Sequence, residues 1–267
     1  MSFSIEGKTA IVTGAANGVG LAIARHFAAR GANVMFADMD EGRLAKECGK
    51  SEEDSTMRYF AGDLREKLTL ANLLSATLDA YDRVDILVNG ARQILPTNVL
   101  DCEDASLETM LGQNLVPAMR LSQIVAKRMI KQAEGNEEER CAGTIVNISS
   151  IAACRTNPHL LGYSVSVAAL DQLTRSMAVS LAEQRIRVNS VAFGSLMSSS
   201  LKNILKEHPG YREEIEKHTP AGRIAGPGEV CEAVQFLASE ASGFMTGQIM
   251  TVDGGRTLID PVGAPMH

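Results

Sequence analysis

Residues 9–20 read TAIVTGAANGVG, and this stretch decides the class of fold. Its first five residues are apolar or β-branched, which predicts a strand buried on both faces. Gly14, Gly18 and Gly20 follow at the spacing G-x-x-x-G-x-G, and apolar residues then recur at helical intervals as far as Phe27. The stretch therefore predicts a strand, a tight glycine turn and a helix.

The alternation of short β-branched runs with helical periodicity continues to the end of the chain. Strands are predicted at residues 9–13, 33–38, 57–60, 86–89, 144–148, 188–192 and 249–252. A late helix is predicted after Pro227 and Gly228, with an apolar stripe of Val230, Ala233, Val234 and Leu237. This order predicts an α/β fold with a doubly wound parallel sheet flanked by helices.

The chain of 267 residues is expected to form one domain, because neither an internal repeat nor a change of composition marks a linker. Its residues are 45% apolar and 22% charged, which is typical of a globular protein. The polar run at residues 134–140 is expected to be a surface connection without a function. No membrane span or signal peptide is recognisable, so we expect a cytoplasmic protein.

Charge and residue types argue against several classes of function. A net charge of −6, the lack of Trp and the lack of a basic stripe argue against nucleic-acid binding. The five histidines have no metal-ligand spacing, and the cysteines never form Cys-x-x-Cys, so neither a metal site nor a disulfide framework is expected. Buried thiols are expected instead at Cys48, Cys102, Cys141, Cys154 and Cys231.

The glycine turn predicts a dinucleotide site. Glycines let the backbone N–H groups and the start of a helix approach a pyrophosphate that side chains would block. A strand before the turn, a helix after it and an acid at the end of the next strand supply the context that this motif requires. The residues expected to bind the cofactor here are Gly14, Asn17, Gly18, Val19 and Gly20.

The acid at the end of the second strand predicts which cofactor is bound. Asp38 lies 24 positions after Gly14, where a carboxylate hydrogen-bonds the ribose 2′-hydroxyl and repels a 2′-phosphate. Neither Asn17 nor Met39 offers a cation to a 2′-phosphate, so NAD(H) is expected to be preferred over NADP(H). Asp63, followed by Leu64, could bind the adenine amino group, or it could cap the next helix.

Along nearly its whole length the chain resembles the short-chain dehydrogenase/reductase family. The matching blocks, beyond the glycine turn and Asp63, are QNL (113–115), IVNISS (145–150), YS (163–164), RVNSV (187–191), PAGR (220–223), TGQ (246–248) and VDGG (252–255). The resemblance implies a single Rossmann-type domain over residues 1–267, with a seven-stranded parallel sheet. It also implies assembly as a homotetramer or homodimer, for which the apolar stripe Leu170, Leu173, Met177 and Leu181 is the candidate contact.

The resemblance also implies the site residues. Tyr163 takes the place of the family's general acid/base, and Ser150, 13 positions earlier, takes that of the serine that hydrogen-bonds the same substrate oxygen. Asn114 corresponds to the asparagine that holds a proton-relay water. Further cofactor contacts are implied at Asn89, Gly90, Ala91, Gly194, Leu196 and Ser198, together with Tyr163 itself.

Two departures from the family pattern affect the predicted chemistry. The family has Tyr-x-x-x-Lys, in which the lysine lowers the pKa of the tyrosine and binds the nicotinamide ribose, but here that position is Val167. Where the family has Asn-Asn-Ala-Gly, residues 89–92 of this chain read NGAR, so Arg92 replaces the glycine. Arg92 either points to solvent or reaches the site and supplies the missing charge. Arg155 and His159 are the other candidate cations.

The loop after the sixth strand departs as well. Phe193 replaces a proline, which removes a rigid turn next to a predicted substrate lid at residues 195–220.

Two hypotheses follow for the whole chain. One is an NAD(H)-dependent oxidoreductase that interconverts a small secondary alcohol and a ketone. The other is an NAD-binding pseudoenzyme or interaction protein that has lost or weakened catalysis with the lysine.

Overall fold

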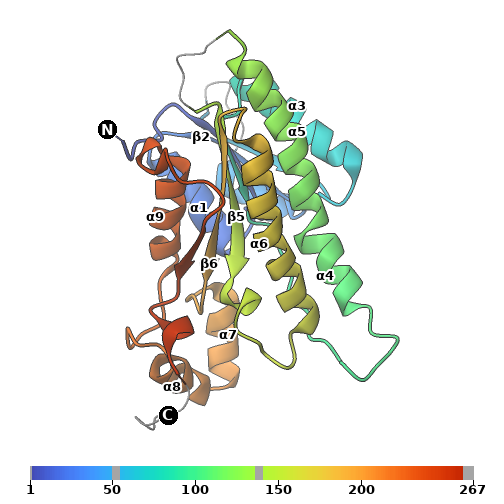
Figure 1. Cartoon of the computed structure of the whole chain (residues 1–267), viewed down its shortest axis with the longest axis vertical. Helices are drawn as coiled ribbons and strands as arrows, with labels where there is room; N and C mark the ends of the chain where they lie inside the picture. The colour runs from blue at the N-terminus through green and yellow to red at the C-terminus, as the bar shows by residue number, and fades with distance from the viewer. Residues whose placement is uncertain (1, 50–54, 136–140, 261–267) are drawn as a thin grey trace.

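A computed structural model describes residues 2–49, 55–135 and 141–260 (Figure 1). Seven parallel strands form one sheet in the order β3-β2-β1-β4-β5-β6-β7. The strands are β1 (Thr9–Thr13), β2 (Asn33–Asp38), β3 (Met57–Ala61), β4 (Ile86–Asn89), β5 (Gly143–Ser150), β6 (Ile186–Phe193) and β7 (Ile249–Val252). The predicted single α/β domain with a parallel sheet is confirmed.

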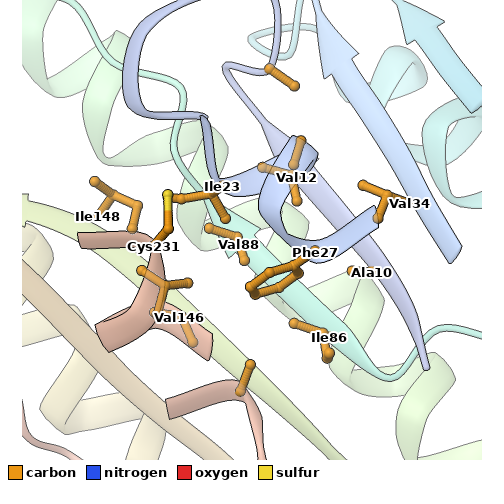
Figure 2. Close-up of a cluster of buried hydrophobic side chains, with 14 of the residues drawn as sticks. Ala10, Val12, Ile23, Phe27, Val34, Ile86, Val88, Val146, Ile148 and Cys231 are labelled. Carbon is orange, nitrogen blue, oxygen red and sulfur yellow. The ribbon is translucent and has the colours of Figure 1, made fainter. Parts of the chain in front are cut away.

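The helices cover both faces of the sheet. They are α1 (Gly18–Ala29), α2 (Glu41–Cys48), α3 (Lys67–Tyr81), α4 (Ser106–Asn114), α5 (Val116–Ala133), α6 (Leu161–Leu181), α7 (Ser199–Glu207), α8 (Gly210–Lys217) and α9 (Pro227–Ala238). Alternate strand residues turn to opposite faces, so Val12 packs beneath α1 and α9, whereas Ile11 packs beneath α3 and α5. Figure 2 shows the first of these clusters, where Phe27 and Ile23 of α1 meet Val12, Val88 and Val146 of the sheet.

Four predicted strands have the observed bounds, β3 extends by one residue to Ala61, and β5 and β6 extend at both ends. The predicted strand 144–148 ends before two serines, yet Ser149 and Ser150 continue the ladder by pairing with Ala192 and Phe193. Strand β6 also begins earlier than predicted, at Ile186 and Arg187. The helix predicted after Gly228 begins at Pro227, which is favourable at the first position of a helix. Residues 136–140 of the predicted polar connection lie outside the described residues.

The expectation of buried thiols is wrong for two cysteines. Cys102 and Cys154 are exposed because both lie in loops, while Cys231 lies on the buried face of α9 and packs in the core. Burial raises the pKa of the Cys231 thiol to about 11. Among the described residues, every cysteine is free.

The stripe predicted as an oligomer contact on α6 packs largely inside its own chain. Leu170 is 3% exposed, and Met177 and Leu181 pack against the cluster beneath α3 and α5. The exposed apolar residues of this helix are instead Leu161, Val165 and Val179. In the part of the chain that the structure describes, no helix has the length and hydrophobicity needed to cross a membrane.

The order of strands positions the site. The chain reverses its direction of travel across the sheet between β1 and β4, and ligands of such folds bind where neighbouring connections diverge in this way, at the carboxyl ends of the strands. Helices α7 and α8 lie at the end of the molecule toward which the β5 arrow points (Figure 1). They fall within the lid predicted at residues 195–220.

Candidate active site

The glycine turn is packed where it meets β4 and open where α1 begins. A Cβ atom on Gly14 would lie 2.7 Å from the carbonyl oxygen of Gly90, and one on Gly20 would lie 2.2 Å from that of Gly14. Gly18 has a φ of +57° and nothing within 4 Å of the position a Cβ would take. Asn17 makes no side-chain cap, so the first N–H groups of α1, including that of Val19, are available to a ligand. This geometry fits a pyrophosphate.

Asp38 ends β2 beside the turn. Its Oδ2 accepts a hydrogen bond from the N–H of Ala16 (3.1 Å), and its Oδ1 accepts from Met39 (2.8 Å) and Asp40 (3.2 Å). These bonds orient the Asp38 carboxylate next to the glycine turn. Asp38 is therefore positioned to bind the ribose of a dinucleotide at the turn, as the sequence predicts.

Asp63 has a partner within its own loop. The Arg65 side chain forms an ion pair with the Asp63 carboxylate, and the N–H of Arg65 donates to Oδ1 (3.0 Å). The hydrogen bonds from this guanidinium lower the pKa of Asp63. Asp63 therefore orders the turn before α3 but does not cap this helix, whose N-cap is Glu66 without a side-chain hydrogen bond. The contact with an adenine stays a prediction.

The end of β4 is tied to the glycine turn. The N–H groups of Gly90 and Ala91 both donate to Oγ1 of Thr13, at 3.0 and 3.1 Å. Leu64, Asn89 and Ala91 line one small cavity together with Thr13, so three residues predicted to contact the cofactor meet there. Gly90 is required by packing, because a Cβ would lie 2.6 Å from the carbonyl oxygen of Thr13.

Asn89 itself belongs to a buried polar network. Its amide donates to the hydroxyl of Ser122 (2.9 Å) and to Oδ1 of Asn147 (2.8 Å), and Asn147 donates onward to Thr174. These bonds join β4 to β5, α5 and α6. The side chain of Asn89 therefore stabilises the strand ends. Its predicted contact with a cofactor would come from the cavity that it lines together with Ala91.

Arg92 lies inside the site. Its Nη1 donates to the hydroxyl oxygen of Tyr163 (3.3 Å) and to the carbonyl oxygen of Ser149 (3.4 Å). Its guanidinium carbon is 4.3 Å from the centre of the Phe193 ring. Of the two interpretations left open by the sequence, the solvent-exposed one is wrong, because three neighbouring groups hold the side chain over the strand ends.

The α6 position where the family has lysine is apolar. Val167 is 1% exposed and packs with Met110 and Tyr163. Tyr163 is itself only 3% exposed, so the contact with Arg92 is made in a largely buried setting. Arg155 and His159, the other candidate cations, are exposed in the loop before α6.

Asn114 holds both the Arg92 segment and α6. Its Oδ1 accepts from the N–H of Gln93 (2.8 Å), and its Nδ2 donates to the Gln93 carbonyl oxygen (3.0 Å) and to Oγ of Ser166 (3.0 Å). Ser166 in turn donates to the carbonyl oxygen of Tyr163 (2.7 Å). One buried amide therefore fixes the backbone directly after Arg92 relative to the helix that carries Tyr163.

Ser150 and the loop after β6 complete the site. Ser150 ends β5 opposite Phe193, and its Oγ accepts from the N–H of Ala152 (3.2 Å), which leaves the hydroxyl hydrogen to donate. Leu196 is buried and bridges to Ala225, whereas Gly194 is half-buried. The hydroxyl of Ser198 caps α7 by accepting from Leu201 (3.2 Å).

Sequence reasoning missed the contact between Arg92 and Phe193. Each was noted as a separate departure, with Phe193 expected to alter the lid. The available signal was that both departures fall at carboxyl ends of strands, since β4 and β6 flank β5. No sequence pattern indicated the contacts of Gln93 and Ser166 with Asn114. Gln93 makes them through its backbone, and a buried serine on a helix has no distinctive sequence pattern.

Comparison with known proteins shows what this chain is similar to. A family model described as "Enoyl-(Acyl carrier protein) reductase" matches residues 14–257. The 7alpha-hydroxysteroid dehydrogenase of Escherichia coli K12 is 32% identical over 252 residues, which cover 94% of each chain.

Two solved structures extend the similarity. A 7 alpha-hydroxysteroid dehydrogenase complexed with NADH and 7-oxo glycochenodeoxycholic acid superposes with a TM-score of 0.86 at 31% identity, covering 95% of this chain and 96% of that one. A gluconate 5-dehydrogenase from Burkholderia cenocepacia, in complex with NADP and tartrate, superposes with a TM-score of 0.86 at 28% identity. It covers 97% of this chain and 98% of its own.

Proposed function

This chain belongs to the short-chain dehydrogenase/reductase family, and from that premise we propose that it is an NAD(H)-dependent oxidoreductase that interconverts a secondary alcohol and a ketone. The observation that carries the proposal is the 3.3 Å contact between Nη1 of Arg92 and the hydroxyl oxygen of Tyr163. It supplies a cation at the acid/base residue of a chain that has Val167 in place of the family's lysine.

Tyr163 moves the proton. In the oxidising direction its phenolate oxygen accepts the proton of the substrate hydroxyl, and in the reducing direction the phenol donates a proton to the nascent alkoxide. Ser150 donates a hydrogen bond from Oγ to the same substrate oxygen and so orients it. Asn114 keeps its predicted role with the proton-relay water, and its amide also positions Gln93 directly after Arg92.

Arg92 supplies the charge. The Arg92 guanidinium donates a hydrogen bond to the phenol oxygen, and it would stabilise the negative charge that develops there during proton transfer. An arginine stays protonated at all physiological pH values, and its planar guanidinium offers five N–H donors where a lysine offers three. Arg92 can therefore contact Tyr163 and Ser149 and still keep further N–H groups for a ribose or a substrate.

The cofactor residues fit a nicotinamide dinucleotide through the open Gly18 and the uncapped start of α1. When bound, such a cofactor supplies or accepts the hydride at the substrate carbon. We propose NAD(H) over NADP(H) because the Asp38 carboxylate would face a 2′-phosphate without a cation at Asn17 or Met39. The remaining proposed contacts are those predicted at Asp63, Leu64, Asn89, Gly90, Ala91, Gly194, Leu196 and Ser198.

We further propose that residues 195–220 act as the substrate lid of a single cytoplasmic domain that assembles as a homotetramer or homodimer. Helices α7 and α8 fill that segment at the carboxyl end of the sheet. Self-association through α6 would use Val165 and Val179, which are exposed, rather than the buried Leu170. The mass of the protein in light scattering at micromolar concentration tests this part.

The second candidate function is a cofactor-binding protein without catalysis. The observation in its favour is that Val167, a buried apolar residue, stands at the position of the family's lysine. Helix α6 therefore offers no cation at that position. The two functions differ in what Arg92 does. In an enzyme its charge serves Tyr163, and in a pseudoenzyme it merely fills the space beside Phe193.

The decisive experiment is a cofactor titration followed by single-turnover hydride transfer against a panel of ketones and alcohols. We expect NADH to bind and at least one ketone to be reduced, with Arg92→Met lowering the rate by about 10² because a general acid/base loses its assistance. Arg30→Met, which removes an exposed arginine paired with Glu232 on the surface, is the control and should leave the rate unchanged. Binding without transfer would favour the pseudoenzyme.

A further inference from the structure

Helices α7 and α8 enclose an open cleft of about 620 Å³ next to the loop that follows β6. The cleft is lined by Met197, Lys202, Asn203, Leu205, Lys206 and Arg212. Met197 comes four residues after Phe193, and its N–H donates to the carbonyl oxygen of Ala225 (2.9 Å). One wall of the cleft therefore continues directly from the loop predicted to contact the nicotinamide.

The charges of this segment are unevenly distributed. Residues 199–218 contain four lysines and arginines and four glutamates, so the segment as a whole is neutral. Three of the four cations line the cleft, and none of the glutamates does. The chain carries a net charge of −6, so this concentration of positive charge runs against the composition of the protein.

The three cations line the same cleft from two helices, and all three are exposed. Lys202 and Lys206 are one turn apart on α7, where like charges repel unless an anion lies between them. Arg212 enters from α8 and shares its charge with Glu216 at 3.3 Å. Met197 and Leu205 add apolar surface to the same cleft. An elongated molecule with an apolar body and one anionic group matches this lining.

We propose that the cleft between α7 and α8 binds the anionic group of an amphipathic substrate, and that Lys202, Lys206 and Arg212 are the residues that bind it. The assignment of the ligand as a substrate rests on the proposed oxidoreductase function. The anion-binding site itself does not depend on that function. The group is a carboxylate, sulfate or sulfonate at a distance from the reacting carbonyl, because the cations that line the cleft belong to α7 and α8, whereas Tyr163 belongs to α6 and contacts Arg92.

A pair of fluorescent probes tests the site without catalysis. 1-Anilinonaphthalene-8-sulfonate carries a sulfonate, and N-phenyl-1-naphthylamine has the same aromatic body without the charge. We expect the double variant Lys202→Gln/Lys206→Gln to weaken sulfonate binding about five- to tenfold, as for two exposed charge contacts, and to leave binding of the neutral probe unchanged. The weakening should shrink as salt is added, because exposed charges are screened.

Lys217→Gln is the matched control, since Lys217 is the one cation of residues 199–218 that does not line the cleft. It should alter the binding of neither probe. Equal weakening by Lys217→Gln, or equal weakening of both probes by the double variant, would overturn the proposal. Circular dichroism of the double variant verifies that the protein as a whole remains folded.

A second measurement addresses the substrate. We expect 10-oxoundecanoate to be reduced with a higher kcat/KM than its methyl ester, and the double variant to remove that preference through KM. Equal kcat/KM values for acid and ester would overturn the substrate assignment. Tyr163→Phe abolishes reduction but should preserve binding of the sulfonate probe, so a failure of the catalytic proposal is distinguishable from a failure of the anion site.

Discussion

The guanidinium of Arg92 stacks over the ring of Phe193, with 4.3 Å between the guanidinium carbon and the ring centre. Phe193 ends β6, and Arg92 lies three residues beyond the end of β4 at Asn89. The two strands are separated by β5, and both residues stand where the family has small or rigid residues. A cation over an aromatic face gains about 0.5–2 kcal/mol, depending on how far the pair is desolvated. Phe193 is 5% exposed and Arg92 is half-buried, so the ring can hold Arg92 against Tyr163 with an effect inside that range.

Replacing the Phe193 ring should weaken catalysis without weakening cofactor binding. Phe193→Leu keeps an apolar residue at the strand end but removes the π face, and we expect hydride transfer to slow about 5- to 30-fold, the equivalent of about 1–2 kcal/mol. Phe193→Tyr retains the ring and should keep most of the rate. Single-turnover rates and the dissociation constant of NADH are the measurements, and a Leu variant as fast as the native protein would contradict the positioning role.

Restoring the family's lysine should not help while Arg92 is present. In Val167→Lys the ammonium enters an apolar site beside Met110 and meets the charge of Arg92, so we expect no gain in turnover and a loss of stability. The double variant Arg92→Gly/Val167→Lys restores the family's pairing and should recover activity that Arg92→Gly loses. A large gain from Val167→Lys alone, together with a silent Arg92→Met, would refute the replacement of lysine by arginine.

Cofactor preference should depend on the charge of Asp38. We expect NADH to bind at least about tenfold more tightly than NADPH, a difference of about 1.4 kcal/mol. Asp38→Ala should narrow the gap, because it removes both the ribose hydrogen bonds and the repulsion of a 2′-phosphate. Asp38→Asn keeps an acceptor for the N–H of Ala16 and separates the effect of charge from that of loop order. Equal dissociation constants of NADH and NADPH for the native protein would contradict the prediction.

Arg187 should be among the residues most important for stability. It is 8% exposed, and its guanidinium donates to the carbonyl oxygens of Leu237 (3.0 Å) and Ser239 (3.1 Å) and to Oγ of Ser242 (2.8 Å). Arg187→Met removes the charged donor from all three acceptors and leaves Leu237 and Ser239 with only hydroxyl donors such as Ser242, so we expect the free energy of unfolding in urea to fall by about 2–4 kcal/mol. Arg30→Met breaks an exposed pair on the surface and should cost less than about 1 kcal/mol.

Glu229 should make stability depend on pH at the start of α9. Hydrogen bonds from Arg223, and a further one from the N–H of Gly226 (2.9 Å), lower the pKa of this carboxyl to about 2. A lowered pKa stabilises the fold above the unfolded value of about 4.3, and the contribution disappears as the pH falls toward 2. Glu229→Gln should therefore reduce the urea midpoint at pH 7, and the difference should vanish in acid. A difference that persists at pH 2 would rule out the charge as its source.

The strand boundaries show where a sequence pattern loses information. The apolar run of β5 stops at Ile148, but the ladder to β6 continues through Ser149 and Ser150, because backbone pairing does not require apolar side chains. Likewise β6 includes Arg187, a charged residue that is tolerated only because carbonyl groups of distant residues satisfy it. The stripe on α6 was recognised, but periodicity alone could not say which of its residues pack on the sheet of the same chain.

The sequence by itself determined the order of strands and helices, the glycine turn, the acid at the end of β2 and the absence of lysine at Val167, because these depend on local spacing. Only the tertiary structure decided what Arg92 does. Whether its long side chain points to water or to Tyr163 depends on Phe193, 101 positions later, and on the Asn114 amide that fixes Gln93. Such contacts arise only when the parallel strands align their carboxyl ends, and no local pattern of residues encodes that alignment.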